Sequence, residues 1–311
     1  MPSRRHILAG LPLLAWRVMY GGMGAWAAAW SKRVAVVFSS ALDPCVEAVE
    51  GLRARLPSDE IALGLVDLNQ SASALALAQE FARKPALVVA VGSDALRAVL
   101  GKEAQALTVS TMTLEADEQN ASPTARVNAA IYLDIPVRTM VLELRKLFPG
   151  KSRVGVIRNP VRGDPSGAQM RGPGAELSSL AVVDCATPEQ LLPAFLGLRK
   201  KVDFVICLPD GALYNGATAR PLIMASLENR LPIVGFSPAF LRAGAAVAIY
   251  PDYRAIGQQT AELIRRCLEP ANCACREAPK QVNVAVNTKI LRLLGIEFMA
   301  AAHPDVTVLL R

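Results

Sequence analysis

The chain has 311 residues, more than one domain usually holds, so we expect two lobes of moderate size. A hydrophobic share of 52% with 20% charged residues excludes a disordered chain, and 5% aromatic residues favour helices packed on sheets over a β-sandwich. The net charge of +7 falls to +4 without Arg4, Arg5 and Arg17. No Lys/Arg cluster is interleaved with aromatics, so the sequence predicts no nucleic-acid partner.

The first 29 residues have the pattern of an export signal. The basic pair Arg4-Arg5 precedes an apolar run, and small residues surround Ala25-Trp26-Ala27. Ser3 and the two arginines, followed by Ile7-Leu8, resemble a twin-arginine export signal. A plain N-terminal helix is the alternative, whereas Arg17 argues against a membrane span. We therefore expect a cleaved signal peptide at residues 1–29 and a periplasmic protein.

Short apolar runs then alternate with amphipathic stretches. They predict strands at 33–40, 60–68 and 106–112, helices at 43–57 and 71–84, and a strand, a Gly-Ser-Asp turn and a helix within 85–102. This alternation indicates a parallel sheet with helices on both faces.

A second α/β half follows a polar, poorly patterned stretch at 113–134, which is typical of a boundary between lobes. It begins with a helix at 136–150. The pattern then predicts strands at 152–160, 180–186, 203–209, 231–238, 245–251 and 281–287, and helices near 188–200, 217–229, 239–244, 252–269 and 288–298. Two such halves place a binding crevice between them, outside the carboxyl ends of their strands.

Small polar residues stand at these strand ends. The candidates for ligand contact there are Ser39, Ser40, Gly92, Ser93, Thr111, Asn159, Asp210, Phe236 and Ser237. The Gly92-Ser93-Asp94 turn joins a buried strand to a helix, and a helix N-terminus favours an anion such as a carboxylate. Simple N-capping is the alternative interpretation of this turn.

Asp210 and Tyr214 also have two interpretations each. A carboxylate at a strand end can hold a ligand ammonium or hydroxyl, but "LPDG" is also an ordinary turn sequence. Tyr214 either covers an apolar ligand group or packs on the helix that follows.

The cysteines and the absence of catalytic motifs bear on whether the chain binds a metal or acts as an enzyme. Cys45, Cys185 and Cys207 lie in apolar or helical surroundings and are expected in the core, whereas Cys267 is expected to pair with Cys273 or Cys275. The spacing is not C-x-x-C and no histidine is near, so we expect no metal. The chain also lacks G-x-S-x-G, H-E-x-x-H, a full dinucleotide fingerprint and a phosphate loop. We therefore expect a binding protein without a cofactor and not an enzyme. A carboxylate-dependent enzyme built on the same two lobes is the alternative, because paired acids far apart in sequence leave no local motif.

Several segments carry a family resemblance. "GKSRVGVIRNP", "VDFVICLPDGAL", "LPIVGFSPAFLRAGAAVAIYPDYRAIGQQTAELIRRCLE" and "VNTKILRLLGIEF" resemble the periplasmic solute-binding proteins of an ABC-transporter family, whose members often act on amino acids. The similarity covers most of residues 33–298. It implies a type I periplasmic-binding fold, in which two Rossmann-like lobes with parallel sheets are joined by a three-strand hinge and close on a solute.

The resemblance also implies the lobe boundaries. The N-terminal lobe is expected at 32–134 plus 252–281, and the C-terminal lobe at 135–251 plus 282–311. The chain departs from the family at 161–180, where four glycines and two prolines replace a long helix.

The implied function is that of an exported, monomeric substrate-binding component of an ABC uptake system. It would bind a small polar solute, for example an amino acid, and present it to a membrane permease. In an amino-acid binder, the turns around Ser39 and Ser93 would hold the carboxylate and Asp210 the ammonium. The alternative is a periplasmic sensor or accessory protein with the same fold that signals to a membrane receptor.

Overall fold

The computed structural model describes residues 32–57, 60–102, 106–121, 127–151, 153–160, 180–269, 273–299 and 306–309. The predicted signal peptide and residues 161–179 of the glycine-rich segment lie outside these ranges. No helix in the described ranges is long and apolar enough to cross a membrane.

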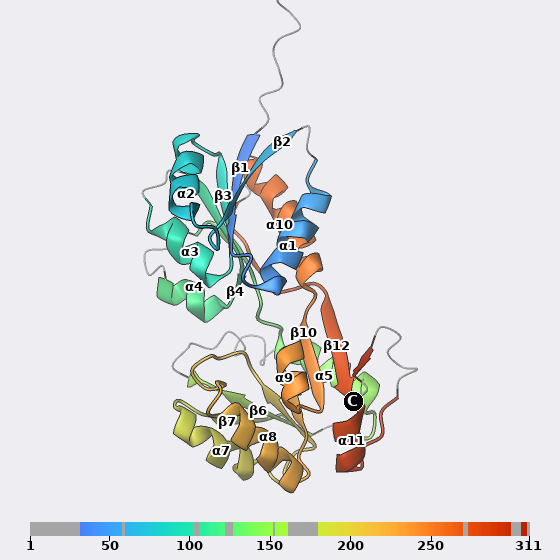
Figure 1. Cartoon of the computed structure of the whole chain (residues 1–311). Helices are drawn as coiled ribbons and strands as arrows, with labels where there is room; N and C mark the ends of the chain where they lie inside the picture. Colours follow the sequence, from blue (N-terminus) through green and yellow to red (C-terminus); the bar gives the residue numbers. More distant parts are fainter. Residues whose placement is uncertain are drawn as a thin grey trace, which may run out of the picture.

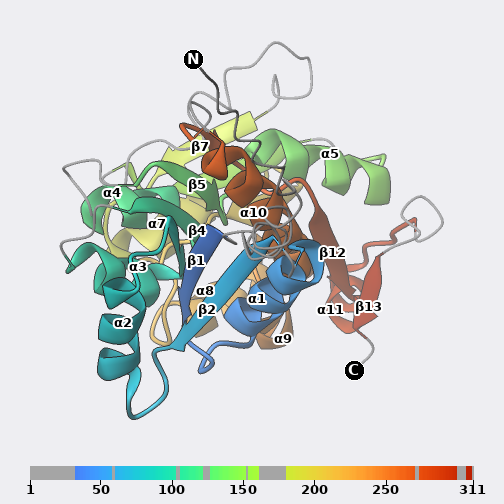
Figure 2. The same cartoon turned by 90° about the horizontal axis from the view of Figure 1, so that it is seen from above.

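The first lobe is a six-stranded parallel sheet in the order β11-β5-β4-β3-β1-β2. Its strands are β1 (Lys32–Phe38), β2 (Ile61–Asp67), β3 (Leu87–Val91), β4 (Leu107–Thr113), β5 (Ala129–Tyr132) and β11 (Arg276–Glu277). Its helices are α1 (Asp43–Arg55), α2 (Ser73–Ala82), α3 (Ser93–Leu100), α4 (Glu115–Ala121) and α10 (Tyr253–Leu268). Helices α1 and α10 cover one face of this sheet, and α2, α3 and α4 lie on the other (Figures 1 and 2). The strands are apolar and buried on both faces, so each face of the sheet forms a hydrophobic core with the helices that cover it.

The second lobe has a seven-stranded sheet in the order β13-β12-β10-β9-β8-β6-β7. Its strands are β6 (Val154–Arg158), β7 (Leu180–Asp184), β8 (Phe204–Cys207), β9 (Ile233–Gly235), β10 (Val247–Pro251), β12 (Val282–Asn287) and β13 (Thr307–Leu309). Its helices are α5 (Val137–Leu147), α7 (Pro188–Gly197), α8 (Ala219–Glu228), α9 (Pro238–Ala243) and α11 (Thr288–Leu294). Only the pairing of β12 with β10 is antiparallel. Helices α5 and α11 pack in one core of this lobe, and α7, α8 and α9 in the other.

The chain crosses between the lobes three times. It passes from β5 to α5, from β10 to α10 and from β11 to β12 (Figure 1). The predicted two-lobed α/β fold with a three-strand hinge is therefore confirmed. The residue boundaries predicted for the lobes stay a prediction.

Most of the described part of 113–134, which the sequence analysis interpreted as a poorly patterned lobe boundary, is regular structure, and only its last two residues lie in the crossing to the second lobe. This stretch holds helix α4 and the buried strand β5, which is a full member of the first sheet. Helix α4 is only seven residues long and acidic, and the apolar run of β5 has four residues. Elements this short leave almost no periodic signal.

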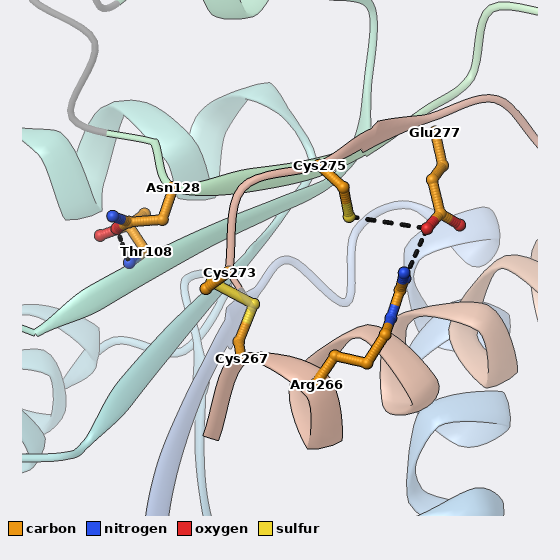
Figure 3. Close-up of a disulfide and its surroundings, with 7 residues drawn as sticks. All are labelled: Thr108, Asn128, Arg266, Cys267, Cys273, Cys275 and Glu277. Carbon is orange, nitrogen blue, oxygen red and sulfur yellow. Dashed lines mark hydrogen bonds and ion pairs between the residues drawn. A yellow bond between two sulfur atoms is a disulfide. The ribbon is translucent and has the colours of Figure 1, made fainter. Parts of the chain in front are cut away.

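A disulfide joins Cys267 to Cys273, one of the two pairings that the sequence allowed (Figure 3). It ties the end of α10 to the approach to β11. The remaining thiol, Cys275, lies 3.5 Å from Glu277 Oε1, and Glu277 is also paired with Arg266. The other three cysteines are buried, as predicted.

Candidate functional site

The carboxyl ends of both sheets face the space between the lobes. Strand β5 runs parallel to β1, β3 and β4, and its carboxyl end leads into the second lobe. Strand β10 likewise runs parallel to β6, β8 and β9, and its end leads back to α10. Loops that follow the remaining parallel strands therefore meet between the lobes, where open α/β sheets bind ligands.

A cavity of about 400 Å³ lies at this end of the first lobe. All of its lining residues come from the first lobe and its hinge connections: Ser39, Leu42, Pro44, Cys45, Val91, Gly92, Ser93, Asp94, Met112, Leu133 and Tyr253. The structure thus brings together three of the predicted residues, Ser39, Gly92 and Ser93. The volume of the cavity is suited to a small molecule.

One end of the cavity is suited to an anion. Helices α1 and α3 both begin here, and no side chain among the described residues caps either N-terminus. Gly92 precedes α3 with a φ of +89°, and a Cβ atom on it would lie 3.3 Å from Cys45 Sγ. The carboxylate of Asp94 lines the cavity too, but it is paired with Arg97. In α1, Pro44 has no N–H and Cys45 N–H donates to Leu42 O at 2.9 Å, so the free N–H groups at this end come mainly from the start of α3. Together with the dipoles of both helices, they favour a carboxylate at this end.

Apart from Asp94 and the two serines, the described cavity wall is uncharged and mostly apolar. It includes Met112, Leu133 and the ring of Tyr253 beside the thiol of Cys45. Burial, with the nearby carboxylate of Asp94, raises the pKa of Cys45 to about 11. Burial, with a smaller contribution from Tyr250, raises the pKa of Tyr253 to about 12. Both groups are therefore neutral near pH 7 and offer apolar contact.

Ser40 and Thr111 do not line this cavity. The backbone N–H of Ser40 donates to Asp67 Oδ1 at 2.9 Å, which fixes the turn after β1. Thr111 is 1% exposed, and its hydroxyl lies 2.9 Å from that of Thr260 in α10. The structure gives both residues a part in holding the first lobe together.

In the second lobe, Asn159 and Asp210 form one pair at the facing edge. Asn159 Nδ2 donates to Asp210 Oδ2 at 2.8 Å. Asp210 Oδ1 accepts from the backbone N–H groups of Ala212 (2.7 Å) and Leu213 (3.2 Å). Asp210 is 5% exposed. This is the turn chemistry that "LPDG" suggested, and it also holds a carboxylate and an amide at the end of the lobe that faces the cavity.

Tyr214 lies in the same turn as Asp210, and its backbone N–H donates to Asp210 O at 2.8 Å. The ring of Tyr214 packs 5.6 Å from Phe236 and 5.8 Å from Phe240 between ring centroids. Its hydroxyl is buried against the thiol of Cys207, a weak partner, and no stronger partner is present among the described residues. Burial therefore raises the pKa of Tyr214 far above its usual range. Ser237 caps α9, because its Oγ accepts from the N–H of Phe240 at 3.2 Å.

Besides Asp94 of the predicted turn, seven lining residues were missed by the sequence analysis: Leu42, Pro44, Val91, Cys45, Met112, Leu133 and Tyr253. The last four form the part of the wall described above. Three of them carry no polar group that draws attention at a strand end, and Tyr253 comes from a helix about 140 residues after β4. Among the described residues, no group of three His, Cys, Asp or Glu is placed to hold a metal ion.

The chain is similar to a known protein family and to solved structures. The model of the family described as ABC transporter substrate binding protein matches residues 127–302, more than half of the chain. No curated protein matches the sequence.

Several solved structures share the two-lobed fold. A ligand-free, open substrate-binding protein with adhesive properties from Clostridium difficile has 17% identity and a TM-score of 0.63, over 89% of this chain and 99% of that one. A protein from Streptococcus pneumoniae in complex with L-Trp has 15% identity and a TM-score of 0.57, over 90% and 100%. A conserved domain protein from Vibrio cholerae has 17% identity and a TM-score of 0.54, over 89% and 99%. At these identities the likeness shows the type I periplasmic-binding fold.

Proposed function

We propose that this chain, which belongs to the ABC transporter substrate-binding protein family, captures a small solute that bears a carboxylate and delivers it to a membrane permease. The protein would work in the periplasm after export by the N-terminal signal. The carboxylate would bind in the cavity of the first lobe, and closure of the hinge would bring the second lobe onto the solute.

The convergence of two uncapped helix N-termini on one cavity carries this proposal. Helices α1 and α3 both begin at the cavity, and the hydroxyl groups of Ser39 and Ser93 lie at the same end, where Ser93 Oγ also donates a long hydrogen bond of 3.4 Å to Asp117 Oδ2. No lysine or arginine is among the described lining residues, so backbone N–H groups and the serine hydroxyl groups are the donors available to the anion. The likeness to a protein that was solved with L-Trp supports an amino acid as the solute.

The test is a binding screen by thermal shift and calorimetry with the twenty amino acids and with small organic acids. At one hundred times its dissociation constant, a true ligand stabilises the folded protein by about 2.7 kcal/mol. If no carboxylate stabilises the protein at millimolar concentration, the proposal fails.

A charge change at Ser93 tests the anion end directly. We expect Ser93→Asp to weaken binding of a carboxylate at least tenfold, about 1.4 kcal/mol, because the new charge stands where the ligand anion binds. Ser93→Asn has nearly the same shape without the charge and serves as the matched control, with affinity much closer to wild type. Ser93 Oγ lies 3.4 Å from Asp117 Oδ2, so the new carboxylate would also repel Asp117. The urea midpoint of each variant therefore separates lost binding from lost stability. Equal affinities of the two variants would contradict a carboxylate at this position.

A substitution of Asp210 tests whether the second lobe holds a ligand ammonium. In Asp210→Asn the amide oxygen can still accept from Ala212 and Leu213, so the turn is retained. We expect affinity for phenylalanine to fall about 30-fold, or about 2 kcal/mol, because a charge-assisted hydrogen bond is lost. Affinity for 3-phenylpropanoate, which lacks the ammonium, should not change. Equal losses for both compounds would leave Asp210 a turn residue only.

A further inference from the structure

Strand β4 contains an irregularity at the cavity. Thr111 pairs with Ile131 and Thr113 with Tyr132, so Met112 is an extra residue without a partner on β5. Its φ is +59°, in the left-handed region. A bulky residue rarely adopts this conformation, and backbone outliers of this kind concentrate at binding sites.

The bulge changes which face of the sheet the following side chains reach. In a regular strand, residues three apart point to opposite faces. Here the hydroxyl groups of Ser110 and Thr113 lie 2.9 Å apart, and Met112 packs in the same core as Val109. The bulge therefore directs Met112 to the face that carries α1 and α10. Without it, Met112 would point toward the other face.

On this face Met112 forms part of the apolar wall. It is 5% exposed, and it packs with Cys45, Leu133 and Tyr253, all of which line the cavity. The anion end, at Gly92 and Ser93, lies in the same cavity. Because the N–H of Gly92 donates to the carbonyl oxygen of Thr111 at 2.8 Å, Met112 lies next to this end. A ligand whose carboxylate sits at the helix N-termini would therefore place its adjoining apolar part against Met112.

We propose that Met112 is the residue that sets the size of the apolar group that the cavity accepts; this rests on the proposed function. The backbone supports this role, because glycine would adopt a φ of +59° without steric conflict, whereas a methionine must be held there by its surroundings. The thioether chain is unbranched and can adjust its rotamers, so it would close the cavity behind a ligand of one size and exclude longer ones.

The experiment compares wild type, Met112→Gly and Met112→Leu. Glycine suits the left-handed backbone and removes the whole side chain, and leucine keeps similar bulk as the matched control. The probes are alanine, leucine, phenylalanine and tryptophan, and calorimetry gives the four dissociation constants for each protein. We expect the ratio of the tryptophan constant to the alanine constant to fall at least tenfold in Met112→Gly. It should stay within about threefold of wild type in Met112→Leu.

The possible results separate the role of Met112 from the proposed function. A wild type that binds amino acids, with an unchanged ratio in Met112→Gly, overturns the role of Met112 and leaves the proposed function standing. A uniform loss for all four probes, at an unchanged ratio, assigns Met112 to general packing and also overturns it. A wild type that binds none of these probes, nor any other carboxylate of the screen, removes the proposed function and this inference with it.

Discussion

Replacing Gly257 by alanine is expected to lower the free energy of unfolding of the first lobe by about 3 kcal/mol. Gly257 lies in α10 where this helix crosses α1. A Cβ atom added to Gly257 would lie 1.9 Å from the carbonyl oxygen of Ala48 and 2.8 Å from the backbone N of Leu52. Both obstacles are backbone atoms, so no side-chain rotation can relieve the clash and the helices must separate.

Each of the two helices contributes a glycine to this contact, so the expected loss of stability is large. A Cβ atom on Gly51 of α1 would lie 2.1 Å from the carbonyl oxygen of Arg254 in α10. Two buried glycines thus let the helix backbones approach each other directly. The higher helix propensity of alanine, worth about 1 kcal/mol, offsets only part of the cost. Because Tyr253 at the start of α10 lines the cavity, separation of the helices should also weaken ligand binding.

Urea denaturation followed by circular dichroism measures this effect. Gly197→Ala is the matched control, since Gly197 is also helical, is exposed, and has no atom within 4 Å of an added Cβ. We expect this control to be unchanged or more stable by about 0.5 kcal/mol. If Gly257→Ala unfolds at the same urea concentration as Gly197→Ala, the close helix contact is not what the geometry indicates.

The same contact illustrates which parts of the fold the sequence could predict. Alternation of apolar strands with amphipathic helices is a local pattern, so β1 to β4 and their helices were predicted correctly. The crossing of α1 and α10 joins residues about 200 positions apart, and a lone glycine in each helix gives no sign of it. Strands β11 and β13, of two and three residues, were missed for the same reason as β5. Their pairing comes from tertiary contacts and not from their own composition.

Of the residues that line the cavity, the sequence predicted polar and glycine residues but none of the apolar ones. Ser39, Gly92 and Ser93 stand at strand ends, where turn residues are visible, and they line the cavity. Met112 lies one residue from the predicted Thr111, but a β-bulge puts it on the same face of the sheet as Thr111, and no residue type in "VSTMT" indicates a bulge. The apolar wall that would choose the ligand therefore had to be found in the structure.

The second prediction concerns Asp134, which lies in the first crossing between the lobes. Its Oδ2 accepts from the backbone N–H of Glu115, the first residue of α4, at 2.8 Å. Burial raises the pKa of Asp134 to about 6, and the carboxylates of Glu115 and Asp117 contribute to the rise. In the unfolded chain the carboxyl group returns to its ordinary pKa, near 3.8.

The sign of the resulting pH dependence follows from proton binding. Between about pH 4 and pH 6, the folded chain holds a proton on Asp134 that the unfolded chain has released. Stability from this group is thus full below about pH 4 and is lost as the pH rises through 6. A shift of this size corresponds to about 3 kcal/mol. At neutral pH the protein bears this cost, since the buried carboxylate is ionised beside two other acids.

Asp134→Asn should therefore make the protein more stable at pH 7.5, by about 3 kcal/mol, because the amide keeps an oxygen for Glu115 and carries no charge. At pH 4 the variant and wild type should unfold at nearly the same urea concentration. Glu50→Gln, which alters an exposed ion pair with Arg254, should change stability by about 0.5 kcal/mol or less at either pH. Parallel pH profiles for Asp134→Asn and wild type would show that Asp134 titrates normally. A gain confined to neutral pH would instead identify a destabilising charge at the crossing between the lobes, the segment that the proposed closure would move.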